Sequence, residues 1–206
     1  MIVTDVVELD KKRSKVFIDG EFAFVLYKGE LREYKIKAGS EISQSIYDEI
    51  IEVVLSKRAK LRAMNLLQKR DYTEKQLSDK LSEGLYPKEL VDEAIEYVKS
   101  YKYLDDERFA SDYITYHMSM RSRNRIVQDL VQKGISKDIL MPLMDEIYEE
   151  SGLESGEDVE LEQIQKLLIK KHYDKDMDYK DKQKIMAFLM RKGYSMDKIR
   201  RAMDYD

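Results

Sequence analysis

The side chains of this chain that are best suited to binding a partner are cations near its middle. Arg121, Arg123, Arg125 and Lys133 fall within the stretch "MRSRNRIVQDLVQKGISK", in which Asp129 is the single acid. A guanidinium group presents a planar fork of N–H donors that fits a carboxylate on a protein or a phosphate on a nucleic acid. The sequence therefore predicts a partner-binding site at these four cations.

The stretch "YLDDERFASDYI" contains three consecutive acids and raises the question of a metal site. Asp105 suits the N-cap of a helix, and the two acids after it favour the positive end of the helix dipole. The glycine and the alternating ligands of a calcium loop are missing. Arg108 opposes the dipole in the same turn, so we add it to the predicted partner-binding set. An ion pair between Arg108 and Asp112 is the structural alternative.

The sequence lacks the residues that catalysis would need. The chain has no cysteine, and its two histidines, His117 and His172, lie far apart without metal-ligand spacing. No glycine-rich loop for the phosphates of a nucleotide is present. The sequence therefore predicts a protein that is not an enzyme, with no catalytic residue, no metal site and no cofactor.

Composition narrows the class of protein. The 206 residues are 43% hydrophobic and 38% charged, with a net charge of −4. This near balance argues against a protein that simply coats nucleic acid. No apolar run approaches the roughly 18 to 20 residues of a membrane helix, and the first residues lack the apolar stretch of a signal peptide. We expect a soluble, cytoplasmic monomer without membrane contact.

Residues 1–42 differ in kind from the rest and predict a small β-rich module. The segments "IVTDVVEL", "KVFIDGEFAFVLY" and "YKIKAG" carry β-branched and aromatic residues. Asp19-Gly20 suits a type I′ hairpin turn. From Ser43 onward the spacing is helical. One apolar stripe is predicted at Ile46, Ile50, Val53, Val54, Leu61, Met64 and Leu67.

An internal repeat organises the helical part. Leu81 has an apolar counterpart 49 positions later, Leu130, and another 59 positions further on, Leu189. Such fixed periods indicate tandem structural units. The other columns are Leu77/Ile126/Ile185, Leu90/Ile139, Val91/Leu140/Ile199, Ala94/Leu143/Ala202, Ile95/Met144/Met203 and Val98/Ile147, with Lys198 the polar exception.

The boundaries between helices repeat as well. Thr73, Ser122 and Asp181 share a column and are each predicted to cap a helix, while Gly134 and Gly193 share the next break. Each copy is thus two helices preceded by a third, and is too small to bury its apolar face alone. The predicted fold is mainly α, with three tandem three-helix repeats that form an elongated curved array after the small β-rich N-terminal module.

The boundaries that follow are 1–42 for the β-rich module, 43–104 for the first repeat with its leading helix, 105–150 for the second repeat, 151–159 for an acidic linker and 160–206 for the third repeat. Pro142 falls in the last helix of the second repeat and lacks a backbone donor. We therefore expect that helix to be kinked or to begin late.

The three arginines around the predicted cap Ser122 oppose the helix dipole, as Arg108 does. Local helix energetics would favour acids at these places. This shared cost favours a functional role for the arginines.

Several of these segments resemble the RecX family, the regulatory proteins of the bacterial recombinase RecA. The resemblance lies in "KYLDDERFASDYI", in "RDYTEKQLSDKL" and in the pattern formed by Arg125, Leu130, Lys133, Gly134 and Ile135. Two positions depart from the family's pattern, Lys102 for a glycine and Gln76 for a glutamate, and both concern helix termination and capping. The resemblance implies a regulator that binds the RecA nucleoprotein filament and modulates, by inhibition, its recombinase and ATPase activity in DNA repair.

Two other functions remain open at this point. A helical-repeat protein could bind single-stranded DNA directly, with its basic helices holding phosphates and its exposed tyrosines stacking on bases. The strip "KRAKLR" at residues 57–62 adds cations to those near residue 125. An unrelated helical scaffold is disfavoured only by the motif match.

Overall fold

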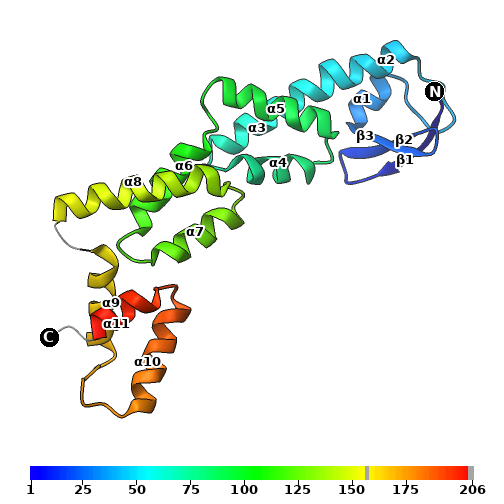
Figure 1. Ribbon diagram of the computed structural model, residues 1–206. Coiled ribbons are helices and arrows are strands. Elements are labelled where there is room, and N and C mark those ends of the chain that lie inside the picture. Colours follow the sequence, from blue (N-terminus) through cyan, green and yellow to red (C-terminus); the bar gives the residue numbers. More distant parts are fainter. Residues whose placement is uncertain (156–157, 204–206) are drawn as a thin grey trace. The chain divides into compact units, whose positions relative to one another are not determined.

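The computed structural model describes residues 1–155 and 158–203, and the side chains of 153–155 are outside this description. The chain divides into two compact units, Met1–Asp105 and Asp106–Asp206. Figure 1 shows the ribbon, with three strands near the N-terminus and helices in the rest of the described chain.

The N-terminal module is a three-stranded antiparallel sheet. Strands β1 (Val3–Glu8), β2 (Arg13–Ile18) and β3 (Glu21–Tyr27) pair in sequence order (Figure 1). Asp19 and Gly20 both have positive φ, 51° and 91°, as a type I′ turn requires. The predicted β-rich start and its hairpin turn are confirmed.

The β character expected of "YKIKAG" is wrong, because the chain leaves the sheet at Tyr27. Helix α1 (Lys28–Glu33) follows at once, and its Glu30 carboxylate accepts a hydrogen bond of 2.7 Å from the Tyr27 N–H. The segment after α1 turns, with Lys35 at a φ of 56°. Ile36 alone enters the core there.

The longer helical run begins after Ser43 as predicted, with the short α1 ahead of it, but the apolar stripe shifts. Helix α2 (Gln44–Glu49) is capped by Ser43 and continues through a π-helical segment η1 (Ile50–Leu55) into α3 (Ser56–Leu67). A π-helix bonds i to i+5, so it turns the residues after it away from the regular helical face. Val53 and Leu61 are therefore 59% and 49% exposed. The buried positions are Ile50, Leu55, Ala59, Ala63 and Leu66.

The first repeat is formed by α3, α4 (Glu74–Ser82) and α5 (Lys88–Ser100). Thr73 and Gln76 form the predicted reciprocal cap of α4, because each side chain accepts the other's backbone N–H. Leu85 and Lys102 take positive φ, 61° and 56°, where glycine is usual. Leu81 is fully buried in a core that this repeat shares with the sheet.

The second unit contains two further sets of three helices. The second repeat is α6 (Asp106–His117), α7 (Arg123–Gln132) and α8 (Lys137–Ser155), and the third is α9 (Val159–Lys170), α10 (Tyr179–Arg191) and α11 (Met196–Met203). Each set encloses its own apolar cluster, in which Leu130 and Leu189 are fully buried. Gly134 and Gly193 have φ of 99° and 95°. The repeat alignment is confirmed at these positions.

Three expectations fail in this unit. Asp178, not Asp181, caps α10, because its carboxylate accepts from the Lys180 N–H and starts the helix earlier. Ile139 is 39% exposed, since the next residue, Leu140, takes the core position. Of the two outcomes expected at Pro142, a late start is wrong, because α8 begins at Lys137 and contains the proline, while a kink stays a prediction. That helix extends to Ser155, into the stretch predicted as a linker, whose residues 156 and 157 lie outside the described residues.

Candidate partner-binding site on the second repeat

Two of the predicted arginines converge on one carboxylate. Arg121 precedes α7, while Arg125 and Asp129 lie one helical turn apart on it. Arg121 Nη1 is 2.5 Å from Asp129 Oδ2, and Arg125 Nε is 3.2 Å from Asp129 Oδ1. The Tyr113 hydroxyl from α6 accepts from Arg121 at 3.0 Å and donates to Asp129 at 3.3 Å. The carboxylate thus holds two guanidinium groups beside a phenol.

Lys133 joins the same cluster through aromatic rings. Its ammonium group lies 5.6 Å from the ring centroid of Tyr113 and 6.0 Å from that of Phe109. These two rings of α6 stack with centroids 6.4 Å apart. We call the set the Tyr113 face; it consists of Phe109, Tyr113, Arg121, Arg125, Asp129 and Lys133.

The surroundings of the Tyr113 face favour the neutral forms of its phenol and of the neighbouring His117 imidazole. Burial, reinforced by the Asp129 carboxylate, raises the pKa of Tyr113. Burial also lowers the pKa of His117, and Arg121 lowers it further. The His117 ring lies 4.2 Å from that of Tyr113. At neutral pH the phenol of Tyr113 and the imidazole of His117 are therefore neutral.

Arg123 does not belong to the Tyr113 face, so the predicted residues do not form one site. Its guanidinium group pairs with Asp145 of α8 and lies 5.5 Å from the centroid of the Tyr148 ring. Its backbone N–H donates a 2.9 Å hydrogen bond to Glu160 of the third repeat. Arg108 is exposed on the first turn of α6. Of the five predicted residues, the structure brings Arg121, Arg125 and Lys133 together.

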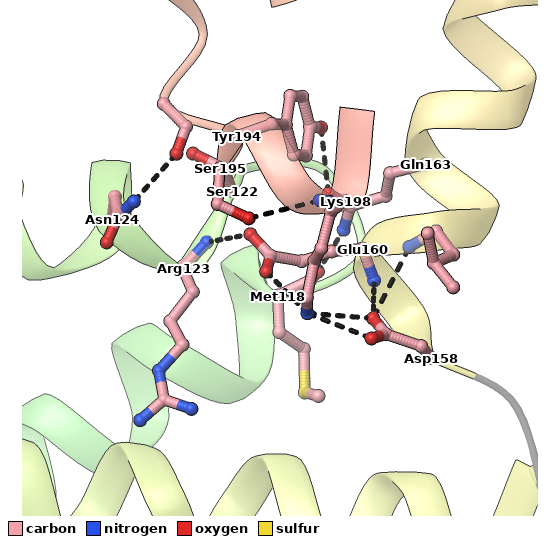
Figure 2. A network of polar contacts seen from close by, with 12 residues as sticks. Met118, Ser122, Arg123, Asn124, Asp158, Glu160, Gln163, Tyr194, Ser195 and Lys198 are labelled. Atoms are coloured by element: carbon pink, nitrogen blue, oxygen red, sulfur yellow. Dashed lines mark hydrogen bonds and ion pairs between the residues drawn. The ribbon is translucent and has the colours of Figure 1, made fainter. Parts of the chain in front are cut away.

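A polar junction connects the start of α7 to the third repeat, as Figure 2 shows. Ser122 Oγ accepts from the Arg125 N–H and donates at 2.6 Å to the Lys192 carbonyl. Asn124 Nδ2 donates at 2.9 Å to the Gly193 carbonyl. The predicted cap Ser122 therefore caps its own helix and also holds the next repeat.

Glu160 is the buried anion of this junction (Figure 2). One carboxylate oxygen accepts the Arg123 N–H, and the other lies 2.8 Å from Lys198 Nζ. Asp158 pairs with the same ammonium group at 2.9 Å. Burial alone would lower the pKa of Lys198, but the two carboxylates outweigh it and raise that pKa. Burial likewise opposes ionisation of Asp158, while Lys198 lowers its pKa.

The carboxylate of Glu160 compensates in part for the arginines near the start of α7. The first turn of that helix contains no acid of its own. Glu160 supplies a carboxylate to it from 37 positions along the chain, as measured from Arg123. A negative charge at a helix N-terminus is favourable, so Glu160 offsets part of the cost of the cations. Sequence periodicity could not find Glu160, because its partner lies in another repeat.

Gly193 allows the two repeats to approach closely. Its φ of 95° favours glycine, and a Cβ added there would lie 2.5 Å from Ser122 Oγ. The glycine thus ends α10 and also leaves room for the cap of α7.

Comparison with known proteins identifies the fold. Family models for the first, second and third three-helix domains of RecX match residues 59–97, 105–140 and 158–203. The "Regulatory protein RecX" of Caldanaerobacter subterraneus subsp. tengcongensis is 30% identical, covering 99% of both chains. This chain belongs to the RecX family. The RecX protein of Clostridium perfringens strain SM101 is 33% identical over 93% of this chain and 90% of its own length.

Solved RecX structures share the fold at lower identity. A crystal structure of regulatory protein RecX aligns with a TM-score of 0.66 at 22% identity, covering 99% of each chain. The RecX structure from Lactobacillus salivarius aligns with a TM-score of 0.59 at 22% identity, covering 73% of this chain and 95% of that one. The Tyr113 face lies within the second RecX domain, and the polar junction connects the second domain to the third.

Two features, a membrane-spanning helix and a metal-binding cluster, are absent from the part of the chain that the structure describes. No helix in residues 1–155 and 158–203 combines the length and the apolar character needed to cross a membrane. Within the same ranges, no three histidine or acidic side chains gather closely enough to hold a metal ion.

Proposed function

We propose that this RecX-family chain regulates the recombinase RecA without catalysis of its own, by binding the RecA nucleoprotein filament and inhibiting its recombinase and ATPase activity in DNA repair. The family match supports the proposal, because it extends over nearly the whole chain and the relatives are named regulatory proteins. The Tyr113 face supplies the contact surface in this proposal.

The observation that carries the contact is the position of Asp129 relative to its arginines. The Asp129 side chain is 12% exposed, whereas those of Arg121 and Arg125 are 42% and 56% exposed. The acid therefore orients the two guanidinium groups from the protein side. Each guanidinium has five N–H donors, so several stay available to a partner. Carboxylates of a protein and phosphates of a strand both suit them, and a nucleoprotein filament contains both.

ATP hydrolysis tests this function directly. The cognate recombinase is assembled on single-stranded DNA and its hydrolysis rate is measured with and without this chain. We expect the rate to fall and the chain to sediment with the filament. An unchanged rate together with no co-sedimentation contradicts the proposal.

Direct binding to single-stranded DNA is the second candidate. The stacked rings of Phe109 and Tyr113 beside Lys133 are the combination of aromatics and cations that such proteins use. On the Tyr113 face, Asp129 uses some donors of both arginines, which limits contact with phosphates and with protein carboxylates alike. Filament binding is the better-supported function because the relatives of this chain are named regulatory proteins. Salt-dependent binding to DNA without recombinase that is lost when Arg121 and Arg125 are replaced would favour the alternative for this face.

A further inference from the structure

The third repeat carries two cations on a single aromatic ring. Lys171 Nζ lies 4.7 Å from the centroid of the Phe188 ring, and Lys192 Nζ lies 5.3 Å from it. The two ammonium groups are thus within about 10 Å of each other. Among the residues that the structure describes, neither has a carboxylate at ion-pair distance. We call these three residues the Phe188 site.

Comparison between repeats shows what is unusual about this site. Lys192 occupies the column of Lys133, and Phe188 occupies that of Asp129. The second repeat places a carboxylate among its cations, while the third places a half-buried ring there. The third repeat therefore has a lysine at the position of Lys133, but it has the Phe188 ring where the second repeat has the Asp129 carboxylate.

The fold holds both lysines in place without an acid. Lys171 is the C-cap of α9 and Lys192 is the C-cap of α10, where the helix dipole favours a cation. The backbone of Lys192 is fixed further, because its carbonyl accepts the hydrogen bond from Ser122. The acids of α10 lie at its other end, at Asp178 and Asp181. The backbone of each lysine is therefore held at a helix end, and neither ammonium group has a carboxylate of the described residues at ion-pair distance.

We propose that the Phe188 site binds single-stranded nucleic acid, with the lysines on consecutive phosphates and a base stacked on the Phe188 ring. Contacts of an ammonium group with an aromatic ring are weak and exchange readily for a phosphate. A partly exposed ring with flanking cations is the combination that sequence-independent binding of a single strand uses. An acidic protein segment would use the lysines alone and leave the ring without a role. The inference rests on the proposed function for its setting, since the filament contains such a strand.

The test is binding of a fluorescent oligothymidylate to the full chain, followed by anisotropy over a series of salt concentrations. Lys171→Gln combined with Lys192→Gln is expected to weaken binding at least tenfold. The slope of log affinity against log salt is expected to fall by about 1.4, because each single-strand phosphate contact contributes about 0.7. Phe188→Leu keeps an apolar side chain packed against the cluster of the third repeat and is expected to weaken binding several-fold without changing the slope.

The matched control is Lys170→Gln combined with Lys180→Gln, which removes the same charge from exposed positions of the same repeat. We expect it to change affinity less than threefold. Equal losses in the two double variants would overturn the site, as would a wild-type chain that does not bind the oligonucleotide. Thermal melting accompanies each variant. If Phe188→Leu does not fold, the comparison between the two double lysine variants still tests the site.

The remaining outcomes separate the two proposals. If the Lys171 and Lys192 variant loses affinity for the filament but keeps its affinity for the free oligonucleotide, the site binds an acidic protein segment and our inference is wrong. If the oligonucleotide binds as expected while ATP hydrolysis by the recombinase is unchanged, the regulatory function fails and the Phe188 site stands.

Discussion

At the scale of single residues, the arginines around Ser122 separate into two roles. Arg121 and Arg125 present donors on the Tyr113 face, whereas Arg123 bonds Asp145 and lies beside Tyr148. Substituting all three together would therefore combine a loss of binding with a loss of packing.

We predict that Arg121→Ala combined with Arg125→Ala weakens filament binding at least tenfold, about 1.4 kcal/mol. The apolar core is untouched, but the Asp129 side chain, which is 12% exposed, loses both cationic partners, so the melting temperature should fall as well. Arg123→Ala should lower the melting temperature while largely preserving affinity. Co-sedimentation and thermal melting measure the two effects. Equal affinity losses in both variants would contradict this division.

The pairing of Lys198 predicts a pH dependence of stability. The pKa of Lys198 is raised above 10.5 in the folded chain, so its contribution is complete below that pH and is lost as pH rises through the folded value. The pKa of Asp158 is lowered below 3.8, so its contribution is complete above that pH and is lost as pH falls through the folded value. The free energy of unfolding that Lys198→Met removes should therefore be constant near neutrality and shrink at both extremes.

Urea unfolding of the wild type and of Lys198→Met, over a range of pH, measures that difference. Lys182→Met is the control, because the Lys182 ammonium group bonds only the Lys175 carbonyl among the contacts of the described residues. A difference that is independent of pH would show that Lys198 acts through packing alone.

Capping residues were predictable from sequence where their partners are local. Thr73 with Gln76 and Ser122 with the Arg125 N–H lie within one turn of each other, so residue type and spacing suffice. Glu160 and Gly193 were not identified as junction residues, because their contacts reach across 37 and 71 positions, to Arg123 and Ser122. A local sequence pattern carries no information about contacts between residues so far apart in the chain.

At the scale of elements, a departure from regular local geometry explains why the predicted apolar stripe differs from the residues that are buried. A regular helix would have placed Val53 and Leu61 inside, but the π-helical segment Ile50–Leu55 changes the face that is buried. Regular periodicity assumes one helical geometry throughout, so it cannot anticipate a wider turn. It succeeded at Leu81, Leu130 and Leu189, which lie in regular α-helices.

Gly193 yields the prediction for the junction between elements. Gly193→Ala must adopt a positive φ and also displace Ser122 Oγ, which would lie 2.5 Å from the new Cβ. Gly39→Ala is the matched control, since its φ of 80° imposes the same backbone strain and its Cβ would meet nothing within 4 Å. Backbone strain alone costs about 1 to 2 kcal/mol. We expect Gly193→Ala to destabilise its unit by clearly more than that.

Amide hydrogen exchange locates the effect. The N–H groups of Arg123 and Arg125 bond Glu160 and Ser122 in the junction, so Gly193→Ala should accelerate their exchange. Gly39→Ala should leave both amides protected. Unchanged protection in Gly193→Ala would mean that Ser122 rotates away at little cost and that the junction tolerates a side chain.

At the scale of the whole molecule, the apolar cores are distributed unevenly. The sheet and the first repeat share one cluster, in which Val16 of β2 and Leu81 of α4 are both fully buried. The second and third repeats each have a cluster of their own and meet through polar groups. The composition changes near residue 42, but the strands already end at Tyr27 and the core continues past residue 42.

This distribution predicts how far the effect of a core mutation extends. Leu81→Ala should cost about 2 to 5 kcal/mol, and because the core is shared it should reduce the protection of amides in the sheet as well as in α4 and α5. Leu130→Ala creates a cavity in an equivalent column, yet it should leave the protection of the sheet unchanged, since its cluster contains residues of the second repeat only. Residue-resolved hydrogen exchange distinguishes the two patterns. Sheet amides that stay protected in Leu81→Ala would show that the β-rich module folds without the first repeat, and that the helical part of the shared cluster contributes little to the stability of the sheet.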